Sequence, residues 1–224
     1  MTNEHPKKYS AFIQKHNREM LIGFGALLVI AIRFVFPAKL DGEIFWINLA
    51  LFFLFPWLII RLLLKEDLKS FGLSWGNRKI GFTLSVVVTL LFVGANYLII
   101  SKPALRNQLQ VSPDLAKGFW TFFWFIFFVS LPLHFFWEFF FRGFIQLGLE
   151  KKLAYSGIFL QALLQTSGYL KSPWLIIFLI FSSALAAGFV ARQSRSIIYS
   201  FVSMWLISTS LDIMIARFIH QGII

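Results

Sequence analysis

The sequence predicts an all-α protein, a polytopic membrane helical bundle with about seven transmembrane helices. Hydrophobic residues make up 58% of the 224 residues and charged residues only 14%, whereas soluble domains average about 45–50% and about 25%. The apolar residues also gather in runs close to the roughly 20 residues that span a bilayer. A soluble domain of this composition would expose large apolar patches. The sequence therefore argues against a soluble enzyme, a disordered tail or a fibrous repeat.

The net charge and the cysteine content narrow the possible partners. The net charge is +11 and the chain contains no cysteine. A basic chain can bind nucleic acid, but the apolar runs leave no soluble domain to carry a basic face, so no nucleic-acid partner is expected. The absence of cysteine excludes disulfides and thiolate metal sites. The lipid bilayer is the partner that the composition predicts most directly.

The first half of the chain predicts a tail and three spans. Residues 1–19 are polar and basic and are expected to form a cytoplasmic N-terminal tail. The apolar run 20–36 follows a long basic stretch and has no small-residue cleavage site, so we expect a retained span rather than a signal peptide. Two more spans are expected over 44–64 and 81–100. With their loops, these segments make up an N-terminal region, 20–117.

The second half predicts a transmembrane core, 118–215, followed by a short C-terminal tail, 216–224. The first apolar run, 118–149, would be about 48 Å long as a straight helix, which exceeds the roughly 30 Å hydrocarbon core of a bilayer. We therefore expect a kink at Pro132. The other expected spans of the core are 155–170, 175–190 and 197–215.

The distribution of basic residues between alternate loops supports this count and predicts an orientation. Of the 21 Lys and Arg residues, 14 fall on the side of the N-terminus and six on the opposite side, while Arg33 lies within a span. Basic residues favour the cytoplasmic side. We therefore expect an inner-membrane or plasma-membrane protein whose N-terminus is cytoplasmic and whose C-terminus lies outside.

Ionisable residues inside spans often mark functional sites, and the first such group is His134, Glu138 and Arg142. Their i, i+4, i+8 spacing puts them on one face of a helix, with Glu138 in the favourable order for an ion pair with Arg142. The neighbouring residues are mostly Phe and Trp. Two interpretations stay open: a catalytic carboxylate held by a guanidinium, or a buried ion pair that sets the helix register.

Two more groups of residues share this i, i+4, i+8 spacing, and each of the three groups is called a stripe below. Gln161, Gln165 and Tyr169 carry amides and a phenol that can form hydrogen bonds between helices. On the last expected span, the stripe consists of Met204, Ser208 and Asp212.

An unpaired aspartate is costly in a membrane, so we expect Asp212 to pair with Arg142 or with Arg217. Three stripes on three helices predict one shared polar interior.

The first stripe contains a recognisable motif. Residues 137–144, Trp-Glu-Phe-Phe-Phe-Arg-Gly-Phe, resemble the Glu-Glu-x-x-x-Arg motif, usually followed by Gly, of the CPBP family. That family comprises CAAX-type prenyl proteases and bacteriocin-processing proteins and is also called the Abi family. The resemblance covers roughly 118–212. It implies a membrane helical bundle acting as an intramembrane protease, in which a Glu and two His residues activate water in a reaction described as metal-dependent or glutamate-type.

The first two family motifs match unevenly. Glu138 and Arg142 occupy the second acidic position and the arginine position, whereas Trp137 stands at the first acidic position. The second motif, Phe-x-x-x-His, falls on Gln165 to Tyr169. The resemblance therefore places Tyr169 at the catalytic histidine, or Gln165 in a shifted register.

The third motif, His-x-x-x-Asn, falls on Met204 to Ser208. Met204 stands at the histidine and Ser208 at the asparagine, and Asp212 resembles an acidic residue carried by some bacterial members. Tyrosine has a pKa near 10, and a thioether is a poorer zinc ligand than imidazole. The ligands for a divalent metal are lost, so no cofactor is expected, and only Glu138 and His134 remain as acid–base groups.

Three functions follow from these residues. The first is a catalytically inactive CPBP-like protein that binds a membrane protein or a hydrophobic peptide as a partner or scaffold. The second is an active CPBP-type endopeptidase with a rearranged site built on Glu138 and His134, with Arg142 holding the carboxylate. The third is a small transporter that uses the polar interior, although the sequence lacks the inverted repeats of many transporters.

Overall fold

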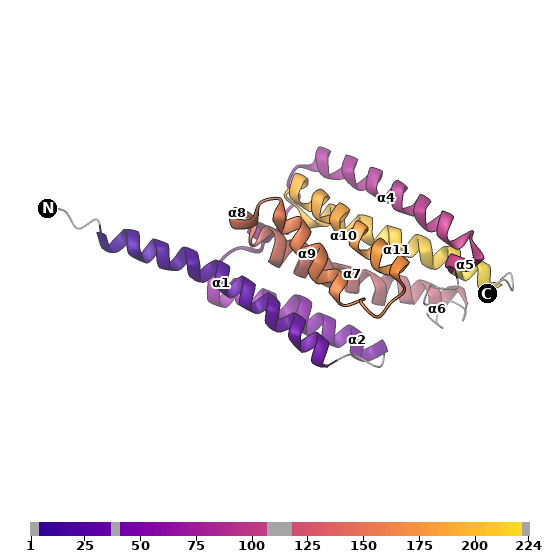
Figure 1. Ribbon diagram of the computed structural model, residues 1–224, viewed down its shortest axis with the longest axis horizontal. Helices are drawn as coiled ribbons and strands as arrows, with labels where there is room; N and C mark the ends of the chain where they lie inside the picture. Colours follow the sequence, from indigo (N-terminus) through magenta and orange to yellow (C-terminus); the bar gives the residue numbers. More distant parts are fainter. Residues whose placement is uncertain (1–4, 37–40, 107–117, 221–224) are drawn as a thin grey trace.

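The computed structural model describes residues 5–36, 41–106 and 118–220, and within them the chain is helical throughout, without a strand (Figure 1). The first half consists of α1 (His5–Val35), α2 (Asp41–Asn48), η1 (Leu49–Leu54), α3 (Phe55–Leu58), η2 (Ile59–Leu64), η3 (Leu68–Phe71), α4 (Arg78–Ile100) and α5 (Pro103–Arg106). The second half consists of α6 (Phe119–Trp124), η5 (Phe125–Ser130), α7 (Leu131–Glu138), η6 (Phe139–Leu147), α8 (Glu150–Leu153), α9 (Ser156–Ser167), α10 (Trp174–Ser194) and α11 (Ile197–His220).

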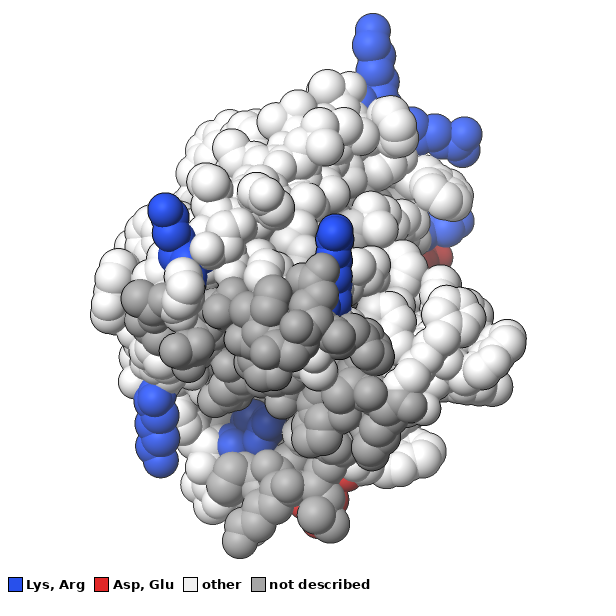
Figure 2. Space-filling view, turned by 90° about the vertical axis from the view of Figure 1, so that its right-hand side faces the viewer, with Lys and Arg blue, Asp and Glu red and all other residues white. Residues whose placement is uncertain are grey.

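Five helical segments in the described part of the chain are long and apolar enough to cross a membrane. They are Gly42–Leu64, Arg78–Ile100, Phe119–Leu147, Trp174–Ser194 and Ile197–Ile219. The large exposed apolar side chains of the bundle agree with a lipid-facing surface. Figure 2 views the bundle from the end where α5 and α6 lie and shows isolated Lys and Arg side chains among uncharged residues. The chain is therefore a helical membrane protein, as its composition predicts.

The expected count of seven spans is not confirmed, because two of the expected spans are not among these five segments of the described chain. The run 20–36 is the apolar part of α1. The run 155–170 contains α9, whose 12 residues extend only about 18 Å. In Figure 1 both segments nevertheless run alongside the long helices.

The expected kink at Pro132 stays a prediction, and the structure shows a local change in helical winding there. From α6 to η6 the helical path is continuous, and η5 is a π-helical turn that ends directly before α7, where Pro132 occupies the first turn. Proline lacks the N–H that an inner helical position must donate, and π turns are a known place where helices bend. A second π-helical segment, η6, follows α7.

The centre of the bundle is η6, all of whose nine residues are buried. Aromatic side chains of η6 and of the preceding α7 pack against the helix that begins at α2. The centroid of the Phe52 ring lies 4.9 Å from that of Phe140 in η6 and 5.2 Å from that of Trp137 in α7. On its other side, η6 contacts α9 and α10. Buried aromatic rings dominate the packing energy of a protein core. The packing of these rings around η6 therefore determines where the polar residues of the same helix lie.

At one end of the bundle, an ion pair and a hydrogen bond join α1 to the loops between helices. Arg18 of α1 pairs with Glu66, with 2.6 Å between Nε and Oε1, and also donates to the Gly148 carbonyl at 2.5 Å. Nearby, Glu150 pairs with Arg195. Segments that sequence analysis places on the N-terminal side of the membrane therefore meet at one end. Burial alone would raise the pKa of Glu66, but the hydrogen bond and the charge of Arg18 outweigh it and hold the pKa below its ordinary value.

We predict that Glu66→Gln lowers the free energy of unfolding near neutral pH by about 1 kcal/mol, the upper range for a partly exposed ion pair. Because folding lowers this pKa, the stabilisation is complete above the ordinary glutamate pKa of about 4.3 and is lost as the pH falls through the folded-state value. Chemical unfolding in detergent across this range measures the difference. Lys79→Gln, at an exposed position on α4, is the control. A difference that does not change with pH would contradict the assignment.

Candidate functional site

A buried ion pair occupies the polar face of the central helix. Arg142 Nη1 lies 3.1 Å from Glu138 Oε1, as the i, i+4 spacing predicts. Arg142 is 0% exposed and Glu138 is 2% exposed. Removing two charges from water is expensive and needs further hydrogen bonds to be tolerated, so the other partners of the guanidinium decide how the pair is stabilised.

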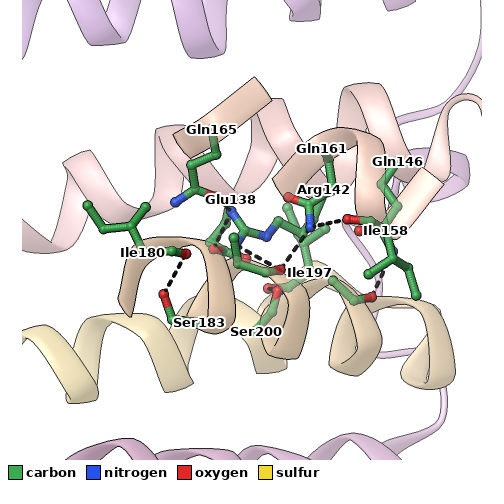
Figure 3. Close-up of polar contacts among 12 residues, drawn as sticks. Glu138, Arg142, Gln146, Ile158, Gln161, Gln165, Ile180, Ser183, Ile197 and Ser200 are labelled. Carbon is green, nitrogen blue, oxygen red and sulfur yellow. Dashed lines mark hydrogen bonds and ion pairs between the residues drawn. The ribbon is translucent and has the colours of Figure 1, made fainter. Parts of the chain in front are cut away.

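Arg142 reaches from η6 to both neighbouring helices. Its Nη1 donates to Gln165 Oε1 of α9 at 2.5 Å, and its Nη2 donates to the Ala184 carbonyl of α10 at 3.4 Å. Figure 3 shows the guanidinium between Glu138 and these helices. One cation therefore connects three helices, and its charge is met by a carboxylate and two neutral oxygens.

Two more glutamines extend this polar contact along the same interface. Gln146 Nε2 donates to the Gly188 carbonyl at 2.7 Å, and Gln161 Nε2 donates to the Ala184 carbonyl at 2.8 Å. The backbone of α10 can approach this closely because Gly188 has no side chain: a Cβ there would lie 2.7 Å from Gln161 Nε2 and 2.8 Å from Gln146 Oε1. The group Glu138, Arg142, Gln146, Gln161 and Gln165 is called the polar seam below.

The polar seam matches the sequence prediction in part. The glutamines of α9 form hydrogen bonds between helices, as expected. Gln146 is an addition that sequence analysis missed, although it continues the i, i+4 series of Glu138 and Arg142 by one more turn.

His134, the first member of that series, forms its hydrogen bonds within its own helix. Its Nδ1 lies 2.8 Å from the Ser130 carbonyl oxygen of the same helix and 3.4 Å from Ser130 Oγ. No hydrogen bond or ion pair joins His134 to Glu138 in the described residues. The two acid–base groups left by the motif comparison are therefore not hydrogen-bonded to each other in the described residues.

The stripe on α11 is not joined to the polar seam by an ion pair or hydrogen bond in the part of the chain that is described. Ser200 of α11 is the residue that lies beside Glu138 (Figure 3). Met204 and Ser208 follow on the same helix, and Asp212 is 12 residues past Ser200, or about 18 Å along the axis.

The expected pairing of Asp212 with Arg142 or Arg217 is wrong, since the described residues contain no ion pair to Asp212. Arg142 is instead engaged by Glu138, Gln165 and Ala184, at a different level of the bundle. The expected shared interior therefore joins η6 and α9 but does not include Asp212.

A cavity of about 490 Å³ lies between α1, the helix containing η1, the α7–η6 helix and the C-terminal end of α9. Its wall includes Trp137, Gln165 and Tyr169, and the Trp137 and Tyr169 rings lie 6.0 Å apart between centroids. These are three of the motif-equivalent positions, so the fold brings them together. Gln165 also accepts the Arg142 hydrogen bond, so the cavity meets the polar seam there. Glu138 and Met204 do not line it.

The donor groups of this cavity do not fit a catalytic metal. Trp137 offers no ligand atom, Gln165 has its oxygen engaged by Arg142, and Tyr169 is a phenol. Zinc sites use imidazole, thiolate and carboxylate. Among the described residues, no three His, Cys, Asp or Glu side chains lie close enough to share a metal ion.

No protein-family model, no curated protein and no solved structure matches this chain. The resemblance to the CPBP family therefore rests on the motif residues alone.

We predict that Gly188→Ala lowers the free energy of unfolding by about 1–3 kcal/mol, the usual result of placing a methyl group in a filled interior. The new Cβ would press on both seam glutamines. The control is Gly94→Ala on α4, where a Cβ would meet nothing within 4 Å, and where alanine should be neutral or stabilising by up to about 1 kcal/mol. Thermal unfolding of the two purified variants compares them directly. Equal stability would show that Gly188 is not needed for the close approach.

Proposed function

We propose that the protein is a non-catalytic membrane-embedded binding protein, related to the CPBP fold, whose cavity receives an apolar chain from the bilayer or from a membrane partner. The observation that carries this proposal is the composition of the cavity wall. Trp137 and Tyr169 line it at positions where the resemblance implies a glutamate and a histidine. A cavity thus lies at the motif positions, and aromatic rings stand where the resemblance implies acid–base groups.

The remaining carboxylate supports a structural role for the polar seam. Glu138 is sealed inside the bundle and bound to Arg142. A general base must reach the proton that it removes, either directly or through one water. Glu138 does not line the cavity, and His134 hydrogen-bonds within its own helix. The residues that could move a proton are therefore separated from the space that could hold a substrate.

The cavity opens toward the lipid-facing surface. Phe34 and Leu170 lie at its wall and are 56% and 67% exposed. A chain that enters between them passes from one apolar environment to another and meets the buried Phe52 and Phe141 rings. We further propose that the charged end formed by Arg18, Glu66 and Glu150 faces the cytoplasm, as the distribution of basic loops predicts.

We predict that a brominated long-chain alcohol, a neutral ligand that quenches tryptophan fluorescence on contact, binds the purified protein saturably. The part of the quenching due to Trp137 should vanish in Trp137→Phe. Gly168→Leu should weaken binding by filling the cavity, because a Cβ at Gly168 has room and contacts only the Gln165 carbonyl oxygen, at 3.7 Å. Gly94→Leu on α4 is the matched control. Equal quenching curves for both glycine variants and the wild type would contradict binding in this cavity.

A cleavage assay separates this proposal from the peptidase alternative. In proteoliposomes with a lipid-embedded peptide substrate, we expect no turnover by the wild type, Glu138→Gln or His134→Ala. Retained secondary structure, measured by circular dichroism, confirms that the variants are folded. Cleavage by the wild type that is lost in folded Glu138→Gln and His134→Ala would overturn the proposal in favour of an active endopeptidase.

A further inference from the structure

We infer that the ligand of this cavity is an amphiphile with an anionic headgroup, a phosphate or a carboxylate, and that Arg33 and Lys171 bind the headgroup. This inference rests on the proposed function, to which it adds the chemistry of the polar end of the ligand. Its basis is an imbalance of charge: among the described residues, two cations line the cavity and no Asp or Glu does.

The first of the two cations is Arg33 of α1. It lies within the apolar part of α1, two residues before the helix ends at Val35, and its side chain is partly buried. Within the described residues, no hydrogen bond or ion pair joins it to another side chain. Charged residues inside a membrane are usually paired or face a water-filled space. An anion in the cavity would supply the missing partner of Arg33.

Lys171 provides a second cation from another helix. It follows the C-terminal end of α9 by four residues and is exposed. Like Arg33, it has no hydrogen bond or ion pair to another described residue. Both cations lie near helix ends, where long basic side chains extend to the headgroup region of a bilayer. Their positions match a ligand whose charge stays at the interface while its chain enters the protein.

The rest of the wall fits the apolar part of such a ligand. Phe34 and Leu170, the sequence neighbours of the two cations, form an exposed apolar rim, and Phe52 and Phe141 are buried. At about 490 Å³ the cavity falls within the usual range of ligand sites, about 300–1,000 Å³. Gln165 adds one donor: its oxygen accepts from Arg142, while its Nε2 forms no hydrogen bond in the described part of the chain and is left for the ligand.

The test compares three chemical probes by their ability to displace the brominated alcohol: dodecyl phosphate, dodecylphosphocholine and inorganic phosphate. We expect dodecyl phosphate to displace it at much lower concentration than the zwitterionic probe. Arg33→Gln and Lys171→Gln should each weaken dodecyl phosphate binding about fivefold, the usual contribution of one basic residue near an anionic lipid surface. Binding of the neutral alcohol should not change in these variants.

Lys102→Gln is the matched control, because Lys102 is an exposed lysine that does not line the cavity. Inorganic phosphate should not displace the alcohol. Displacement by inorganic phosphate would identify a free-phosphate site and would contradict the proposal that the ligand is an amphiphile. If the alcohol binds but the two dodecyl probes compete equally, or Arg33→Gln and Lys171→Gln behave like Lys102→Gln, the anionic headgroup is wrong and the proposed function stands. If the alcohol does not bind saturably, the proposed function fails as well.

Discussion

The structure depends on a guanidinium that is buried among aromatic rings in the middle of a membrane bundle. Arg142 is fully enclosed, and a buried charge is costly unless a counter-charge and hydrogen-bond acceptors surround it. Its two Nη atoms have such partners, whereas its Nε has none among the described residues. Glu138 supplies the counter-charge from the same helix, Gln165 supplies an oxygen from α9, and Ala184 supplies a backbone carbonyl from α10. Because each acceptor comes from a different helix, satisfying Arg142 sets the positions of α9 and α10 against η6.

This arrangement connects the polar seam to the cavity through one residue. Gln165 binds Arg142 with its oxygen and lines the cavity with the rest of its amide. On the opposite side of the central helix, the Phe52 ring packs against Trp137, so the same helix carries the seam, the aromatic core and part of the cavity wall. Filling the cavity and stabilising the bundle are therefore linked in physical terms: a ligand that orders Gln165 also orders the partner of the buried charge.

Local patterns predicted the parts of the site that lie on one helix or on neighbouring turns. The four-residue spacing of Glu138 and Arg142 predicted their ion pair. The same spacing of the two glutamines of α9 predicted hydrogen bonds between helices. The partner of Asp212 could not be predicted, because periodicity shows which face of a helix is polar but not at which level two helices meet. The two cations of the cavity were missed for a related reason: Arg33 and Lys171 are 138 positions apart in the sequence, and the packing of both α1 and α9 against η6 brings them to one cavity. The span count is not confirmed at α9, where an apolar run of 16 residues contains a helix of only 12 residues, because hydropathy reports composition and not the length of the helix.

A double-mutant cycle on Glu138 and Arg142 tests the central claim most directly, namely that the ion pair is part of the scaffold and is compensated locally. Unfolding in detergent is measured for Arg142→Met, Glu138→Leu and the double variant. The account predicts that each single change lowers the free energy of unfolding by about 3–5 kcal/mol, because it leaves one charge buried alone, and that the double variant regains most of that loss. Losses that simply add in the double variant, or single variants as stable as the wild type, would contradict it.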